Sequence, residues 1–187
     1  MDRDAVSLIK ADHRVLEGLF DQVKKADGEQ RKALLAEVKA RLDAHSRAEE
    51  EYVYPALIKA DPGERGEVHH GAEEHLEADE LLGKAIKATG DFDARFQEFV
   101  DAVSHHVEEE EQDLLPALRE AVPAAELRRL GDQFDRARRE HLAEHGIGAE
   151  VPTQATREQL YERAKAAGIP GRSTMTKEEL AEALRQS

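Results

Sequence analysis

The 187-residue sequence contains no cysteine and no tryptophan, and aromatic residues make up only 4% of it. Without thiolates, the chain can form no zinc–thiolate site, iron–sulfur cluster, disulfide or cysteine nucleophile. It also lacks an apolar run as long as a membrane span, and no apolar segment follows Met1 in the manner of a secretion signal. We therefore expect a cytoplasmic protein with no membrane partner.

Basic residues are also in deficit. The chain has 27 Lys and Arg against 41 Asp and Glu, a formal net charge of −14. Because nucleic-acid binding depends on clustered Lys and Arg, this balance disfavours a nucleic-acid partner for the chain as a whole. Charged residues make up 36% of the sequence, helix-forming residues dominate and β-branched residues are sparse. The composition predicts an all-α protein, with room for one domain and a small appendage.

Hydrophobic residues recur at helical spacing in five segments. The expected helices cover about residues 4–26, 30–60, 64–89, 91–121 and 123–144, and Gly, Pro and Asp residues separate them. Asp91 is the predicted N-cap of the fourth helix. Four long helices joined by short turns predict an up-down-up-down four-helix bundle, and the fifth helix is expected to lean on it.

A change of composition marks the end of this bundle. Residues 146–155 contain the Gly and Pro residues typical of a linker, so we expect a bundle domain over residues 1–145 and a small module over residues 156–187. The sequences Thr156-Arg-Glu-Gln159 and Thr176-Lys-Glu-Glu179 are capping-box patterns. They predict a two-helix module, with helices over about residues 157–167 and 177–186.

The sequence contains one pattern of histidine, glutamate and proline twice. In each copy, a glutamate follows a histidine by four residues, and a Pro-Ala-Leu tripeptide begins six residues after that glutamate. A further histidine on the preceding predicted helix precedes the pattern by 32 residues in the first copy and by 31 in the second. The repeated residues are His13, His45, Glu49 and Pro55 in one copy and His75, His106, Glu110 and Pro116 in the other.

This spacing suits metal binding. Residues four apart lie on one face of a helix, so an imidazole and a carboxylate can bind the same ion. A single pair of this kind is usually a solvated surface pair, but duplication in register favours a shared function. Two hairpins packed with these faces inward would present four imidazoles and two carboxylates, a set suited to a dinuclear site of Fe, Mn or Zn. The predicted ligands are His13, His45, Glu49, His75, His106 and Glu110. Histidines outside the repeat, at positions 69, 70, 141 and 145, are expected on the surface.

At these six positions the chain resembles the hemerythrin family, specifically its bacterial HHE cation-binding branch, over about residues 4–121. The resemblance implies a bundle holding two non-haem iron ions, oxo- or hydroxo-bridged, with Glu49 and Glu110 as bridging ligands. Oxygen-carrying hemerythrins have one more histidine a turn before the third, where this chain has Gly71. They also place an aspartate five residues after the last histidine, a spacing that His105 rather than His106 would have to Glu110. These two departures disfavour reversible oxygen carriage. The candidates for the open coordination position are water, His70, Glu74, Tyr52 and Tyr54.

The C-terminal 30 residues are similar to the small helix–extended–helix module at the N-terminus of transcription terminator Rho. That resemblance implies a nucleic-acid partner, while the alternative is a protein partner or simple packing on the bundle. For the whole chain, the leading hypothesis is a di-iron protein that binds or reacts with a small oxidant, namely oxygen, peroxide or nitric oxide. Enzymatic activity, such as peroxide degradation, stays open. The alternatives are a non-enzymatic iron or oxygen sensor that signals through the C-terminal module and a structural zinc-binding bundle.

Overall fold

The computed structural model describes residues 4–147 and, beyond them, positions 161, 169, 171–172, 175–176, 179–180 and 183. The chain divides into two compact units, Met1–Ala149 and Glu150–Ser187. All regular structure in the described residues is helical, which confirms the predicted all-α class. No helix among them is long and apolar enough to cross a membrane.

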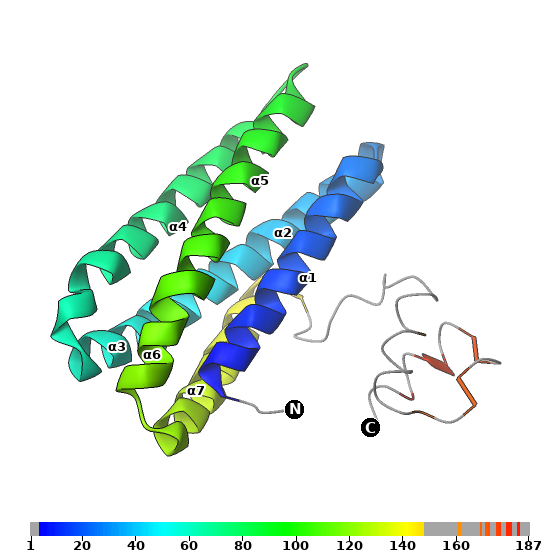
Figure 1. The fold of residues 1–187 in the computed structure, drawn as a ribbon. Helices are drawn as coiled ribbons and strands as arrows, with labels where there is room; N and C mark the ends of the chain where they lie inside the picture. Colours follow the sequence, from blue (N-terminus) through cyan, green and yellow to red (C-terminus); the bar gives the residue numbers. More distant parts are fainter. Residues whose placement is uncertain are drawn as a thin grey trace. The chain divides into compact units, whose positions relative to one another are not determined.

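Five helical rods make up the described part of the first unit (Figure 1). The first is α1 (Ala5–Lys25), and the second joins α2 (Gly28–Ala48), the π-helical turn η1 (Glu49–Val53) and α3 (Tyr54–Ala60). A short 3-10 turn, η2 (Pro62–Glu64), leads into α4 (Arg65–Ile86). The fourth rod joins α5 (Phe92–Glu109), the π-helical turn η3 (Glu110–Leu114) and α6 (Leu115–Ala121), and the fifth is α7 (Ala124–Glu144). Each rod lies within a few residues of a predicted helix.

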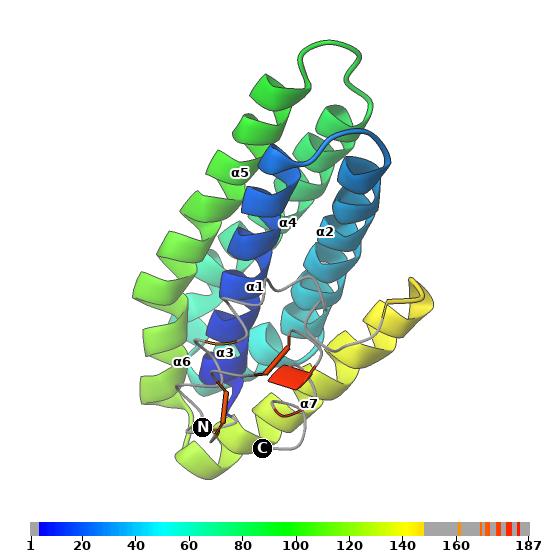
Figure 2. The ribbon, with the colours of Figure 1, turned by 90° about the vertical axis from the view of Figure 1, so that its right-hand side faces the viewer.

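The rods are arranged as two hairpins and a crossing helix (Figure 2). In one hairpin α1 packs on α2, and in the other α4 packs on α5. The first hairpin turns at Asp27, and Gly28 takes a positive φ of 48° there, which glycine adopts without strain. The two hairpins meet through α2 with α4 and through α1 with α5 and α6, while α7 packs across α1 and α2.

Asp91 occupies the N-cap position of α5, as predicted, but its side chain makes no capping hydrogen bond. It accepts instead from Nε of Arg95 on the outside of the helix.

Both π-helical turns begin at the glutamate of the repeated pattern, η1 at Glu49 and η3 at Glu110. In each, the residue before the proline donates its backbone N–H to the carbonyl of that glutamate, five residues back. Pro55 and Pro116 follow directly. A proline has no N–H to donate and its ring crowds the carbonyl four residues earlier, so a local widening of the helix relieves the conflict. Such turns are frequent at functional sites.

In the part of the first unit that the structure describes, the core consists of two large hydrophobic clusters and a small one formed by Ala40, Ala44 and Leu142. One large cluster lies among α1, α2, α4 and α5 and includes Phe20, Phe96 and Phe99, whose rings contact one another edge-on or tilted. The other lies among the start of α1, α3, α6 and α7 and includes Phe134. On α1, Ile9 belongs to the second cluster and Leu16 to the first, so the predicted ligand His13 lies between the two. The core is therefore divided by a polar layer.

In the second unit, Ile169 and Leu180 are buried together, with Met175 and Tyr161 packed against them. The second predicted capping box is confirmed. The Thr176 N–H donates to Oε2 of Glu179 at 2.7 Å, and the Glu179 N–H donates to the Thr176 hydroxyl oxygen at 3.2 Å. The first capping box, at residues 156–159, lies outside the described residues, as does most of the helix expected after it.

Candidate metal centre

The structure brings the six predicted side chains together in the polar layer, as two adjoining groups. One group contains His13, His45, Glu49 and Glu110, and the other contains Glu49, His75 and His106. Within each group, one nitrogen or oxygen atom of every residue lies within 4.8 Å of the others. Glu49 belongs to both groups, whereas Glu110 belongs only to the first.

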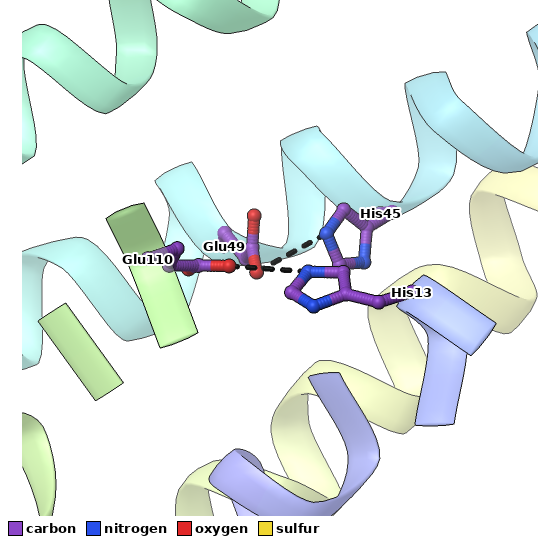
Figure 3. Close-up of side chains that lie close together, drawn as sticks. All are labelled: His13, His45, Glu49 and Glu110. Atoms are coloured by element: carbon purple, nitrogen blue, oxygen red, sulfur yellow. Dashed lines mark ion pairs between the residues drawn. The ribbon is translucent and has the colours of Figure 1, made fainter. Parts of the chain in front are cut away.

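The first group joins α1, the second rod and η3 (Figure 3). Nε2 of His13 lies 3.1 Å from Oε2 of Glu110, and Nε2 of His45 lies 3.3 Å from Oε1 of Glu49. The His45 and Glu49 side chains project from the same face of the helix, as their four-residue spacing predicted. The close-up shows all four side chains converging on one point.

The second group is built by Glu49 from the second rod and by the two histidines of the other hairpin. Oε2 of Glu49 lies 3.4 Å from Nε2 of His75. Nε2 of His75 lies in turn 3.1 Å from Nε2 of His106. The two carboxylate oxygens of Glu49 thus each face a histidine of a different group.

These six residues are almost completely buried, with relative exposures between 0 and 7%. Both oxygens of Glu49, both of Glu110 and Nε2 of His13 have no hydrogen-bond partner within the protein. Buried polar atoms, and carboxylates above all, are costly unless a partner compensates them. Imidazole nitrogens and carboxylate oxygens that converge without protein partners fit divalent metal ions that prefer nitrogen and oxygen ligands.

The charges of the buried groups depend on one another. Burial, reinforced by the neighbouring Glu110 carboxylate, raises the pKa of Glu49 well above its ordinary value. Burial also opposes ionisation of Glu110, but the close approach and charge of the His13 imidazole, 3.1 Å away, outweigh it and lower the pKa of Glu110 to about 2. The same carboxylates, against the effect of burial, raise the pKa of His13 to about 9. Burial lowers the pKa of His45 to about 4. Without metal, one histidinium therefore balances the Glu110 carboxylate while ionisation of Glu49 is disfavoured, whereas divalent ions would compensate both groups as carboxylates.

An outer ring of carboxylates faces the Nδ1 atoms of the four histidines. Glu111 lies 2.9 Å from Nδ1 of His13, Glu50 lies 2.9 Å from Nδ1 of His75, and Glu74 lies 2.9 Å from Nδ1 of His106. The fourth member, Asp12, faces Nδ1 of His45 at 3.7 Å. Carboxylates in these places fix the orientation of ligand histidines and leave Nε2 for the metal.

The outer ring is duplicated like the inner one. An acidic residue directly precedes the first histidine of each copy, at positions 12 and 74, and another directly follows the glutamate, at positions 50 and 111. The preceding acid faces the second histidine of its own hairpin, whereas the following acid reaches a histidine of the other hairpin. As metal ligands, the repeated pattern predicted only the six inner residues. The same register comparison that identified the inner residues could have found this ring.

Helix α7 makes the two halves of the centre unequal. Arg138 donates from one guanidinium nitrogen to Oδ1 of Asp12 at 2.7 Å and from the other to Oδ1 of Asp135 at 2.8 Å. The ring of Phe134 contacts that of His45 edge-on, with centroids 5.8 Å apart. Asp12 is therefore held from the fifth rod, α7, whereas Glu74, the corresponding acid of the other hairpin, faces the exposed His70.

The side chain of Tyr54 lies against Gly71, the position at which oxygen-carrying hemerythrins have a further histidine. The Tyr54 ring is stacked on that of His75, with centroids 5.8 Å apart, and its buried hydroxyl has no hydrogen-bond partner. A Cβ atom on Gly71 would lie 2.8 Å from this hydroxyl, so the tyrosine fills the space that a larger residue would need. Burial and the nearby carboxylates raise the pKa of Tyr54 well above its ordinary value.

The other histidines lie outside the buried groups. His69, His70 and His145 are exposed, as expected. His105 is also exposed and pairs with Glu109, so the geometry favours His106 over it as the buried residue. The expectation of an exposed His141 is wrong: its side chain is only 13% exposed and lies 3.4 Å from Glu51, because α7 packs against η1.

An open groove of about 650 Å³ runs between α3 and the first half of α4 beside the second group. Tyr54 and Glu50, which both contact His75, form part of its wall. Pro55, Ile58 and Val68 make the lining largely apolar. The groove thus reaches two side chains, Tyr54 and Glu50, that contact His75 of the second group.

Fold and site together define a helical protein with buried His/Glu groups suited to metal cations. The family model for the hemerythrin HHE cation binding domain matches residues 4–118. The chain therefore belongs to the hemerythrin HHE cation-binding family, and this membership implies metal cation binding by His and Glu groups. The part of the resemblance that concerned Rho stays a prediction.

The chain is also similar to individual proteins. An uncharacterised protein of Mycobacterium tuberculosis is 33% identical over 137 residues, which cover 70% of this chain and 83% of that protein. A DNA nickase of a Nostoc species is 27% identical over 157 residues, covering 80% of this chain and 44% of the nickase. The crystal structure of a hemerythrin HHE cation binding domain-containing protein from Mycobacterium kansasii has a TM-score of 0.68 and 22% identity. It covers 96% of this chain and 98% of its own, and this likeness shows the fold.

Proposed function

We propose that the chain holds two metal ions side by side in the polar layer and that Glu49 bridges them. One observation carries this proposal. The two oxygens of Glu49 face His45 and His75 in separate groups, and neither oxygen has a hydrogen-bond partner within the protein. Two metal ions held close together repel each other and need an anionic ligand between them. Of the two predicted glutamate ligands, Glu49 belongs to both groups and Glu110 to the first alone.

The remaining residues divide between the two ions. His13, His45 and Glu110 would complete the first site, and His75 and His106 the second. Tyr54 supplies the further donor at the second site, because its buried hydroxyl has no other partner and occupies the space opposite Gly71. Two other candidates for the open coordination position point away from the second site. His70 is exposed, and Glu74 faces Nδ1 of His106.

We take the two ions to be iron, as the resemblance to the hemerythrin family implies. When bound, iron would supply electrons to a small oxidant such as oxygen, peroxide or nitric oxide. The protein's own residues control access and orientation. The groove beside Tyr54 and Glu50 offers a path from solvent to the second site, while Phe134 and Arg138 close off the first. The outer carboxylates keep each histidine ring turned with Nε2 inward.

Metal analysis combined with electronic spectroscopy tests this function. Wild-type protein loaded anaerobically with Fe²⁺ and then desalted to remove exchangeable metal is expected to retain two ions per chain and, after oxidation, to absorb in the near ultraviolet and visible. Glu49→Gln keeps the shape of the side chain but removes its charge, and it is expected to lose at least one ion. Glu77→Gln, at an exposed position of α4, is the matched control and should retain both.

The other outcomes are equally informative. One ion or none in the wild-type protein would refute the dinuclear centre. If protein purified from iron-fed cells contains two zinc ions and does not absorb visible light, the site is structural and has no redox function. Oxygen release from added peroxide would identify the protein as an enzyme rather than a sensor.

A further inference from the structure

A third group of ligand atoms lies outside the buried centre, between α4 and α5. It consists of His70, Glu74 and Glu109, whose donor atoms lie within 4.8 Å of one another. Nε2 of His70 lies 3.6 Å from Oε1 of Glu74 and 3.4 Å from Oε2 of Glu109. The other oxygen of Glu109 lies 3.2 Å from Nε2 of His105. Two histidines and two carboxylates from two helices thus meet at this surface.

Glu74 connects this outer group with the buried centre. Its Oε2 lies 2.9 Å from Nδ1 of His106, while its Oε1 faces His70. The Glu74 side chain is only 13% exposed, whereas those of His70 and Glu109 are 54% and 40% exposed. The carboxylate is therefore held in place by the buried histidine and presents its second oxygen outward, toward solvent-accessible donors.

A neighbouring pair shows that this arrangement is more than helical spacing. His69 and Glu73 have the same four-residue separation on the same helix, and their side chains lie 3.4 Å apart. They are 76% and 63% exposed, and no third donor joins them among the residues that the structure describes. Convergence of donors from a second helix distinguishes His70 and Glu74 from this ordinary surface pair.

We infer that His70, Glu74 and Glu109 bind a divalent metal ion at the surface and pass it to the buried centre. Imidazole and carboxylate donors select Fe²⁺, Mn²⁺ or Zn²⁺. Three donors at an exposed place leave positions for water, so the ion can exchange readily. Glu74 lies between the outer ion and His106 and provides the route inward. The transfer role rests on the proposed function of His106, whereas the outer site itself does not.

Metal stoichiometry tests the site. Full-length metal-free protein is dialysed against Zn²⁺, and bound zinc is measured. The wild type is expected to bind three ions, His70→Ala two, and the control His69→Ala three. Equal stoichiometry in the two variants would overturn the outer site. Glu49→Gln separates this test from that of the buried centre, because it is expected to lose buried metal and still bind the ion that His70→Ala loses.

Loading kinetics test the transfer. The appearance of the oxidised iron spectrum after addition of Fe²⁺ and oxygen reports filling of the buried centre. His70→Ala is expected to fill more slowly than His69→Ala but to reach the same final absorbance, because it keeps every buried donor. Equal filling rates would refute the transfer role. A lower final absorbance in His70→Ala would also refute it, because it would place His70 within the centre itself.

Discussion

Replacing Arg138 tests whether the fifth helix supports the metal centre. Arg138→Met keeps the apolar stem of the side chain and removes the guanidinium that bridges Asp12 and Asp135. Asp12 would keep its position beside His45 but lose its cationic partner. We expect lower stability and weaker metal binding, through two separate effects.

The magnitude follows from the two hydrogen bonds. Each joins charged groups at 2.7–2.8 Å, and such bonds contribute about 1.5–3 kcal/mol each. The side chains retain 10–15% exposure, and Asp135 also pairs with Arg139 at 2.7 Å, so part of the loss is recovered. We expect the free energy of unfolding to fall by about 2–4 kcal/mol. Loss of the support behind a ligand histidine typically weakens metal binding 10- to 100-fold, and we expect about the lower figure here.

Arg139→Met is the matched control. Arg139 lies next in sequence, pairs with the same Asp135 and is 56% exposed, but no contact links it to Asp12. A surface ion pair of this kind contributes less than about 1 kcal/mol. Urea unfolding of the metal-free proteins measures stability, and competition with a chelator measures affinity. If both variants bind metal equally well, the fifth helix does not support His45 through Asp12.

Three further predictions concern packing, metal and the tail. A Cβ atom at Gly83 would meet no neighbouring atom, so Gly83→Ala should stabilise α4 by up to about 1 kcal/mol in urea unfolding. Gly71→Ala should show no such gain and should shift the iron spectrum, because its Cβ would meet the hydroxyl of Tyr54. Equal gains would mean that Tyr54 moves without cost. Chelation should lower the melting temperature, because buried carboxylates lose their compensation; an unchanged melting temperature would argue against buried metal. Truncation after Gly148 should leave metal content and spectrum intact, because the proposed ligands all precede it; iron loss on truncation would show that the tail supports the bundle.

Much of the fold and the inner residues of the site could be predicted from the sequence, for a local reason. The period of hydrophobic residues and the Gly, Pro and Asp breaks are properties of each helix by itself, and the rods lie within a few residues of their predicted bounds. The pairing of His45 with Glu49 depends on the geometry of one helical turn. Duplication then identified the six buried side chains, because two copies of a pattern in register reveal positions that one copy hides among other carboxylates.

The tertiary structure decided every feature that depends on which helices are neighbours. Glu50 and Glu111 contact histidines of the opposite hairpin, and no spacing along one chain segment encodes that approach. Arg138 reaches Asp12 across 126 residues because α7 packs on α1, and His141 is largely buried for the same kind of reason. The sequence alone did not show which side chain lies against Gly71. Packing places the Tyr54 hydroxyl there, because the space available to a side chain is set by the surfaces that meet at that point.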